Sequence, residues 1–91
     1  KVIQEEMPDL ILLDLLFPNE HGFTILKKIR ANAAYKSIPV IIISADNNSS
    51  TIKKAFELGA NDFLAKPLNL QDLKNKVYNI INNELTKNNQ L

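Results

Sequence analysis

Three polar residues, Asp14, Ser44 and Lys66, each come at the end of a separate apolar run. A carboxylate can attack phosphorus and become an aspartyl phosphate, in a reaction governed by positioning and charge neutralisation. An ammonium group could neutralise one phosphoryl oxygen, and a hydroxyl group could donate a hydrogen bond to another. If the fold brings the three residues together, the sequence predicts a site for phosphoryl transfer.

The pattern of apolar residues explains how these side chains could meet. Continuous apolar runs at 10–13 and 40–43 are typical of strands covered on both faces of a parallel sheet, and a shorter strand is expected at 62–65. Apolar residues at helical spacing alternate with these runs and predict a helix after each strand. The alternation favours an α/β fold with a doubly wound parallel sheet. Parallel strands end at one edge, where such sheets bind their ligands, so the three polar residues would gather there.

Turn and capping residues mark where the predicted helices begin and end. Pro18 and Gly22 are turn residues between the first strand and the first helix. The polar stretch at 46–50 offers N-caps for the second helix, and Gly59 is placed as its C-terminal stop. Asn69 can cap the last helix. The apolar face of that helix is expected to pack against the sheet and comprises Leu70, Leu73, Val77, Ile80 and Ile81.

Composition indicates one small domain and excludes several classes of function. The chain has 91 residues, of which 45% are hydrophobic, and this suits a single globular unit. A net charge of +1 with scattered lysines gives no nucleic-acid footprint. The absence of cysteine excludes disulfides and thiolate metal sites. No apolar run approaches the roughly 18 residues of a membrane span, so a cytoplasmic location is expected.

At these residues the chain resembles the receiver domains of two-component response regulators. Residues 8–14, with Pro18 and Gly22, look like the phosphoacceptor strand and its loop. Residues 41–45 look like the strand that carries the hydroxyl, and residues 59–67 resemble the segment that ends in a lysine–proline pair. Order and spacing agree over nearly the whole chain. The resemblance implies a flavodoxin-like, CheY-like fold in three α/β/α layers, in a cytoplasmic signalling protein of bacterial type.

The resemblance also implies a role for each site residue. Asp14 would accept a phosphoryl group from the phosphohistidine of a histidine kinase or a phosphotransfer protein. Lys66 would pair with the phosphate, and its bond to Pro67 would be cis. Ser44 and Phe63 would be the switch pair, with the aromatic ring moving inward as the hydroxyl closes on the phosphoryl group. The domain is therefore expected to be a switch rather than an enzyme.

Magnesium is implied by the resemblance, with Asp14 and the backbone carbonyl of Leu16 as ligands. Receiver domains also carry an acidic pair at the end of their first strand, but this chain starts at Lys1, in what resembles the second helix of the family. We therefore expect residues 1–85 to form a partial receiver domain without the first two strands and first helix, followed by a polar tail at 86–91. Without the acidic pair, phosphorylation of this chain alone is expected to be weak or absent.

Three functions are compatible with the sequence. The first is a phosphorylated switch whose output partner reads a face within residues of about 46–85. The second is a pseudo-receiver that keeps the fold as a protein-interaction module without phosphoryl chemistry. A flavin or nucleotide binder is disfavoured, because the chain has no glycine-rich phosphate loop. Taken singly, Asp14 is equally consistent with a loop or cap carboxylate, and Lys66 is more typical of a surface charge. Only their joint placement favours the first function.

The first strand raises a further expectation. If the strands before Lys1 are missing, the strand at 10–13 becomes an exposed apolar edge, which invites pairing with another chain. The 91 residues alone are therefore expected to be oligomeric, for example as a homodimer, or strand-swapped or poorly folded.

Overall fold

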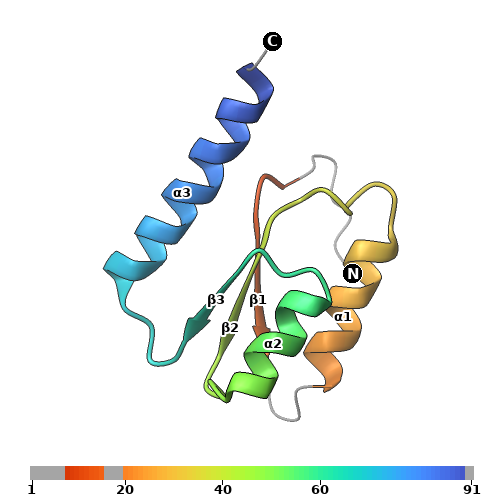
Figure 1. Cartoon of the computed structure of the whole chain (residues 1–91), viewed down its shortest axis with the longest axis vertical. Coiled ribbons are helices and arrows are strands. Elements are labelled where there is room, and N and C mark those ends of the chain that lie inside the picture. The colour runs from red at the N-terminus through yellow and green to blue at the C-terminus, as the bar shows by residue number, and fades with distance from the viewer. Residues whose placement is uncertain (1–7, 16–19, 90–91) are drawn as a thin grey trace.

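The computed structural model describes residues 8–15 and 20–89, in which strands and helices alternate. In chain order the elements are β1 (Ile11–Leu15), α1 (Glu20–Ala31), β2 (Val40–Ser44), α2 (Ser49–Glu57), β3 (Asp62–Ala65) and α3 (Leu70–Asn89). The strands pair in parallel in the order β1-β2-β3, and their arrowheads all point to the same edge of the sheet (Figure 1). The predicted alternation and the parallel sheet are therefore confirmed.

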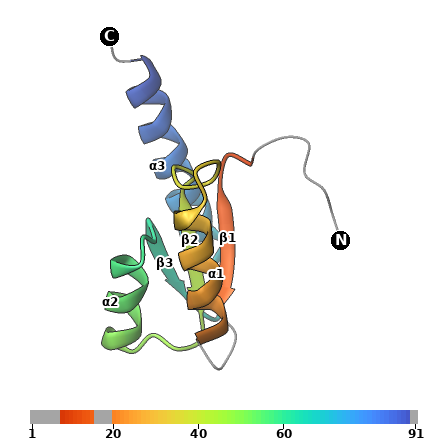
Figure 2. The ribbon, with the colours of Figure 1, turned by 90° about the vertical axis from the view of Figure 1, so that its right-hand side faces the viewer.

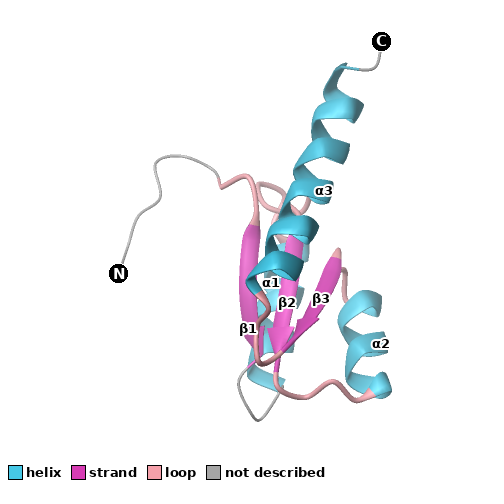
Figure 3. Cartoon of the chain, turned by 90° about the vertical axis from the view of Figure 1, so that its left-hand side faces the viewer, coloured by secondary structure: helices cyan, strands magenta, loops and turns pink. Residues whose placement is uncertain are grey.

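Helices cover both faces of this sheet. Helices α1 and α2 lie over one face (Figure 2), and α3 lies over the other (Figure 3). Because side chains alternate along a strand, Val40 and Ile42 pack toward α1 and α2, whereas Ile41 and Ile43 pack toward α3. All five residues of β2 are buried. A central strand covered on both faces needs apolar residues at every position, which explains the continuous run in the sequence.

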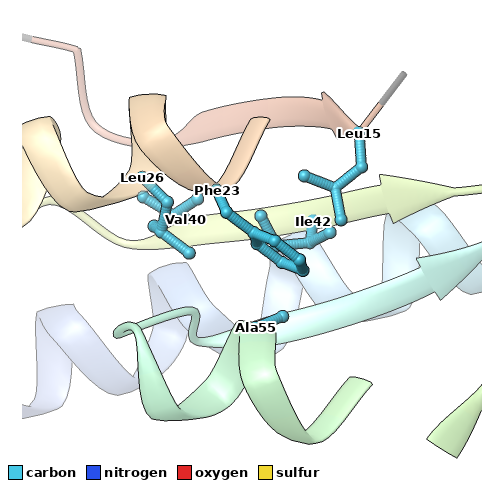
Figure 4. Packing of buried hydrophobic residues seen from close by; sticks show 6 residues of the cluster. All are labelled: Leu15, Phe23, Leu26, Val40, Ile42 and Ala55. Carbon is cyan, nitrogen blue, oxygen red and sulfur yellow. The ribbon is translucent and has the colours of Figure 1, made fainter. Parts of the chain in front are cut away.

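The larger part of the core lies between the sheet and the α1–α2 layer (Figure 4). Phe23 and Leu26 of α1 project onto the sheet, as their helical spacing predicts. Ala55 of α2 is fully buried in the same cluster. The Lys54 ammonium lies 5.5 Å from the centroid of the Phe23 ring, a cation–π distance that links α2 to α1. These contacts hold both helices on one face of the sheet.

Helix α3 covers the second face through Leu73, Val77 and Ile80. Leu70 and Ile81 were expected on the same face but are 69% and 38% exposed, so this part of the prediction is wrong. Leu70 is the first residue of the helix, and contact with the sheet begins one turn later. The helix also continues to Asn89, well beyond the sheet (Figure 3), although a polar tail was expected from residue 86. No glycine or proline interrupts residues 70–89, so nothing in the sequence ends the helix earlier.

The predicted caps are present. The Asn48 side chain accepts a hydrogen bond from the Ser50 amide at 3.0 Å, and the Asn69 side chain accepts from the first amides of α3. Gly59 has a φ of 109°, which only glycine adopts readily, and it ends α2 as expected. Within the described ranges, none of the helices combines the length and apolar character needed to cross a membrane.

Candidate functional site

The register of the sheet brings the three predicted residues to one edge. Leu15, the neighbour of Asp14, lies opposite Ser44, and Ser44 lies opposite Ala65, the residue before Lys66. The backbone N–H of Lys66 donates to the carbonyl oxygen of Ser44 at 2.9 Å. Asp14 lies within β1 rather than after it, because the strand continues to Leu15. The predicted gathering at the carboxyl edge is therefore found.

Asp14 and Lys66 form an ion pair across this edge. The Lys66 Nζ lies 2.8 Å from the Asp14 Oδ2, although 52 residues separate the two in sequence. The side chains are 44% exposed at Asp14 and 36% exposed at Lys66, so the carboxylate can be reached from solvent. Such partly exposed pairs contribute only about 0–1 kcal/mol to folding. The pair thus supplies positioned positive charge rather than much stability.

Ser44 approaches the edge from the opposite face of the sheet. Its side chain is on the α1–α2 side, is 1% exposed, and accepts a hydrogen bond from the Asp46 amide at 2.9 Å. Because the hydroxyl accepts in this bond, its own proton is available for another acceptor. Carboxylate, ammonium and hydroxyl groups therefore approach the edge from both faces, an arrangement suited to a group with several oxygens.

Phe63 lies on the same face of the sheet as Ser44. It is opposite Ile42 in the register, two residues before the residue that pairs with Ser44. The ring is half-buried and packs against the cluster beneath α1 and α2. The role of Ser44 and Phe63 as a switch pair, and the inward movement of the ring, stay predictions. The Lys66–Pro67 bond is cis, as the resemblance implied.

Gly22 sets the distance between β1 and α1. It was expected in a turn, but it lies in the first turn of α1 and is buried against Leu15. A Cβ atom at this position would lie 3.3 Å from the Leu15 Cα and would collide with the Leu15 side chain. Glycine is therefore needed for close packing, directly beside Asp14, rather than for a turn.

The predicted magnesium ligands are only partly described. Leu16, the second predicted ligand, lies outside the described residues. Among the residues in 8–15 and 20–89, no three histidine, cysteine, aspartate or glutamate side chains come together. Magnesium prefers several hard oxygen ligands, and Asp14 supplies one carboxylate that already contacts an ammonium group. The described side chains do not by themselves fit a magnesium site, and the metal stays a prediction.

One polar group near the site was missed by sequence reasoning. The sequence predicts Asp46 only as one of the candidate N-caps at 46–50. In the structure its Oδ2 accepts a hydrogen bond from the Thr51 hydroxyl at 2.9 Å. Its Oδ1 accepts from the Asn48 amide at 3.0 Å. The available signal was an acidic residue two positions after Ser44 and five before a threonine.

A second hydrogen-bond network lies at the opposite end of the strands, where β2 and β3 begin. Arg30 donates to the carbonyl oxygens of Gly59 at 2.9 Å and of Ile38 at 2.8 Å, and to Oδ1 of Asn61 at 2.8 Å. Burial lowers the pKa of the Arg30 guanidinium from its ordinary value. The side chain ties α1 to the loops that precede β2 and β3. It lies at the amino ends of these strands and has no contact with the Asp14 site.

Comparisons with known proteins agree with this geometry. The response regulator receiver domain family matches residues 1–78. The chain is 42% identical over 66 residues to the two-component response regulator ARR3 of Arabidopsis thaliana, covering 72% of this chain and 29% of that protein. It is 40% identical over 75 residues to the transcriptional regulatory protein KdpE of Staphylococcus aureus, covering 82% and 31%. The chain thus spans about a third of the length of these relatives, which come from a plant and a bacterium.

A solved structure shows the same architecture. The crystal structure of a response regulator from Thermotoga maritima matches with a TM-score of 0.76 and 28% identity, covering 86% of this chain and 63% of that chain. The match confirms the flavodoxin-like arrangement of the described strands and helices.

Proposed function

Because the chain belongs to the response regulator receiver domain family, we propose that Asp14 accepts a phosphoryl group and that the modified domain acts as a conformational switch. The observation that carries the proposal is the 2.8 Å contact between the Asp14 carboxylate and the Lys66 ammonium. The donor is a phosphohistidine of a histidine kinase or of a phosphotransfer protein.

The proposed transfer uses groups of this chain. A carboxylate oxygen of Asp14 attacks phosphorus, the P–N bond of the phosphohistidine breaks, and the leaving imidazole nitrogen takes a proton from solvent. Lys66 transfers its ion pair from the carboxylate to the phosphoryl oxygens and neutralises their charge. The Ser44 hydroxyl donates its proton in a hydrogen bond to another of these oxygens. The product is an acyl phosphate, held at an edge that solvent and a partner protein can reach.

The new group shifts the equilibrium between two conformations of the domain. Ser44 moves toward the phosphoryl group, and the Phe63 ring follows it inward on the same face of the sheet. An output partner then reads the surface formed by α2, β3 and α3, within residues of about 46–85. In this proposal the chain is a switch in the cytoplasm, and any enzymatic output belongs to another domain or protein.

Phosphorylation of the full-length protein tests this proposal. With acetyl phosphate as donor, we expect mass spectrometry to find one phosphoryl group on Asp14, and its acyl linkage to be cleaved by hydroxylamine. The Asp14→Asn variant is expected to lose the label, whereas Asp9→Asn, which alters an exposed acid in the same segment, is expected to keep it. A label that persists in Asp14→Asn, or a wild-type protein that accepts none, would overturn the proposal.

The pseudo-receiver is the second candidate. The observation in its favour is the lack of any acidic cluster among the described residues that could hold magnesium. This candidate predicts that partner binding is the same before and after treatment with the phosphodonor. The switch predicts that partner affinity changes on treatment, and that Asp14→Asn abolishes the change.

A further inference from the structure

A chain of hydrogen bonds connects the Ser44 hydroxyl to the first turn of α2. The Asp46 amide donates to the Ser44 Oγ at 2.9 Å, and the carboxylate of the same residue accepts from the Thr51 hydroxyl at 2.9 Å. The other carboxylate oxygen accepts from the Asn48 amide at 3.0 Å. Backbone and side chain of Asp46 therefore hold opposite ends of this loop.

The two residues at the ends of this chain of hydrogen bonds, Ser44 and Thr51, are both buried. Ser44 is 1% exposed, and Thr51 is 9% exposed in an otherwise exposed first turn. Thr51 lies one helical turn before the fully buried Ala55, on the face of α2 that packs against the core. A buried hydroxyl that loses its partner must be desolvated without compensation, which is unfavourable. Thr51 and Asp46 are therefore expected to move together rather than separate.

We propose that Asp46 is a positioning residue that transmits movement of the Ser44 hydroxyl to α2 through Thr51. The proposal rests on the proposed function, because it concerns the response to a phosphoryl group on Asp14. When Ser44 closes on that group, the Asp46 amide follows the Ser44 Oγ. The Asp46 carboxylate then draws the Thr51 hydroxyl, and with it the amino end of α2. This route is separate from the Phe63 ring, which acts from β3.

The proposal predicts that occupancy of Asp14 and movement of α2 can be separated. A simple capping role for Asp46 would not predict this. Without the Thr51 hydroxyl, Ser44 can still donate to the phosphoryl group, so Asp14 is still occupied. Helix α2, however, no longer receives the movement. Loss of coupling in such networks changes a conformational equilibrium by roughly 2- to 30-fold.

The test uses beryllofluoride, which mimics the phosphoryl group, on the full-length protein. Fluorine NMR reports occupancy of Asp14, and the amide NMR shifts of residues 52–57 report the position of α2. We expect saturating beryllofluoride to shift these amides in the wild type. In Thr51→Val, we expect occupancy to persist while the equilibrium constant between the shifted and unshifted states falls roughly 2- to 30-fold.

Two further variants and a control decide the outcome. Thr51→Ser keeps the hydroxyl and is expected to restore the shift, which a loss of helix packing alone would not predict. Asp46→Ala removes both carboxylate oxygens without changing any residue of helix α2, and it is expected to lose the shift as Thr51→Val does. Ser50→Ala removes the exposed hydrogen bond between Ser50 and Asn48 and is expected to behave as the wild type. A full shift in both Thr51→Val and Asp46→Ala would overturn the inference, whereas a wild type that binds no beryllofluoride would overturn the proposed function itself.

Discussion

The Lys66 ammonium lies 2.8 Å from the Asp14 carboxylate, across the carboxyl edge of the sheet and 52 residues away in sequence. The two residues come from the ends of β1 and β3, with β2 between them. The contact spans the full width of the described sheet. A charged pair of this kind places a cation where a phosphoryl group on Asp14 would bring negative charge.

Lys66→Met should therefore impair chemistry far more than stability. We expect the rate of Asp14 phosphorylation by acetyl phosphate in the full-length protein to fall by roughly 100-fold, because one positioned cation is lost. The free energy of unfolding should change by less than about 1 kcal/mol, since the pair is partly exposed. Time courses of acyl phosphate formation and urea unfolding measure the two effects. Lys53→Met, at an exposed position of α2, is the control, and an unchanged rate in Lys66→Met would contradict the prediction.

Gly22→Ala should destabilise the domain although alanine is the better helix former. The new methyl group would collide with Leu15, and relief of the collision would push α1 away from β1. Overpacking of this kind costs about 1–3 kcal/mol, which outweighs the gain in helix propensity of about 1 kcal/mol. Urea unfolding of the full-length protein measures the difference. Thr24→Ala, on the exposed side of α1, should change stability little, and a more stable Gly22→Ala variant would show that the helix has room to shift.

The 91-residue chain on its own should self-associate through β1. In the part of the chain that the structure describes, β1 pairs with β2 alone, and its Leu12 is 47% exposed. An unpaired apolar edge favours pairing with a second copy. We expect light scattering to show a mass that rises with concentration, and Leu12→Lys to reduce this association. Phe56→Lys alters a similarly exposed apolar residue on α2 and should not. A monomer at all concentrations would refute the prediction.

Local signals in the sequence predicted every described strand and helix and most of their ends. The strand expected at 62–65 coincides with β3, and Asn69 and Gly59 cap their helices as expected. Such predictions succeed because strand burial and helix capping depend on residues close together in the chain. The predictions for Leu70 and for the end of α3 were wrong because they depend on contacts between residues far apart in the chain. Helical spacing alone does not say where the sheet beneath a helix begins or ends.

The sequence by itself determined which polar groups stand at the ends of the buried strands, because a strand covered on both faces must be apolar until it reaches the sheet edge. Only the tertiary structure decided that Lys66 contacts Asp14, that Gly22 fits against Leu15, and that Asp46 joins Ser44 to Thr51. The first two contacts depend on the register of parallel strands and on the approach of a helix to the sheet. The third depends on the path of a loop. None of these distances is encoded in the spacing of residues along the chain.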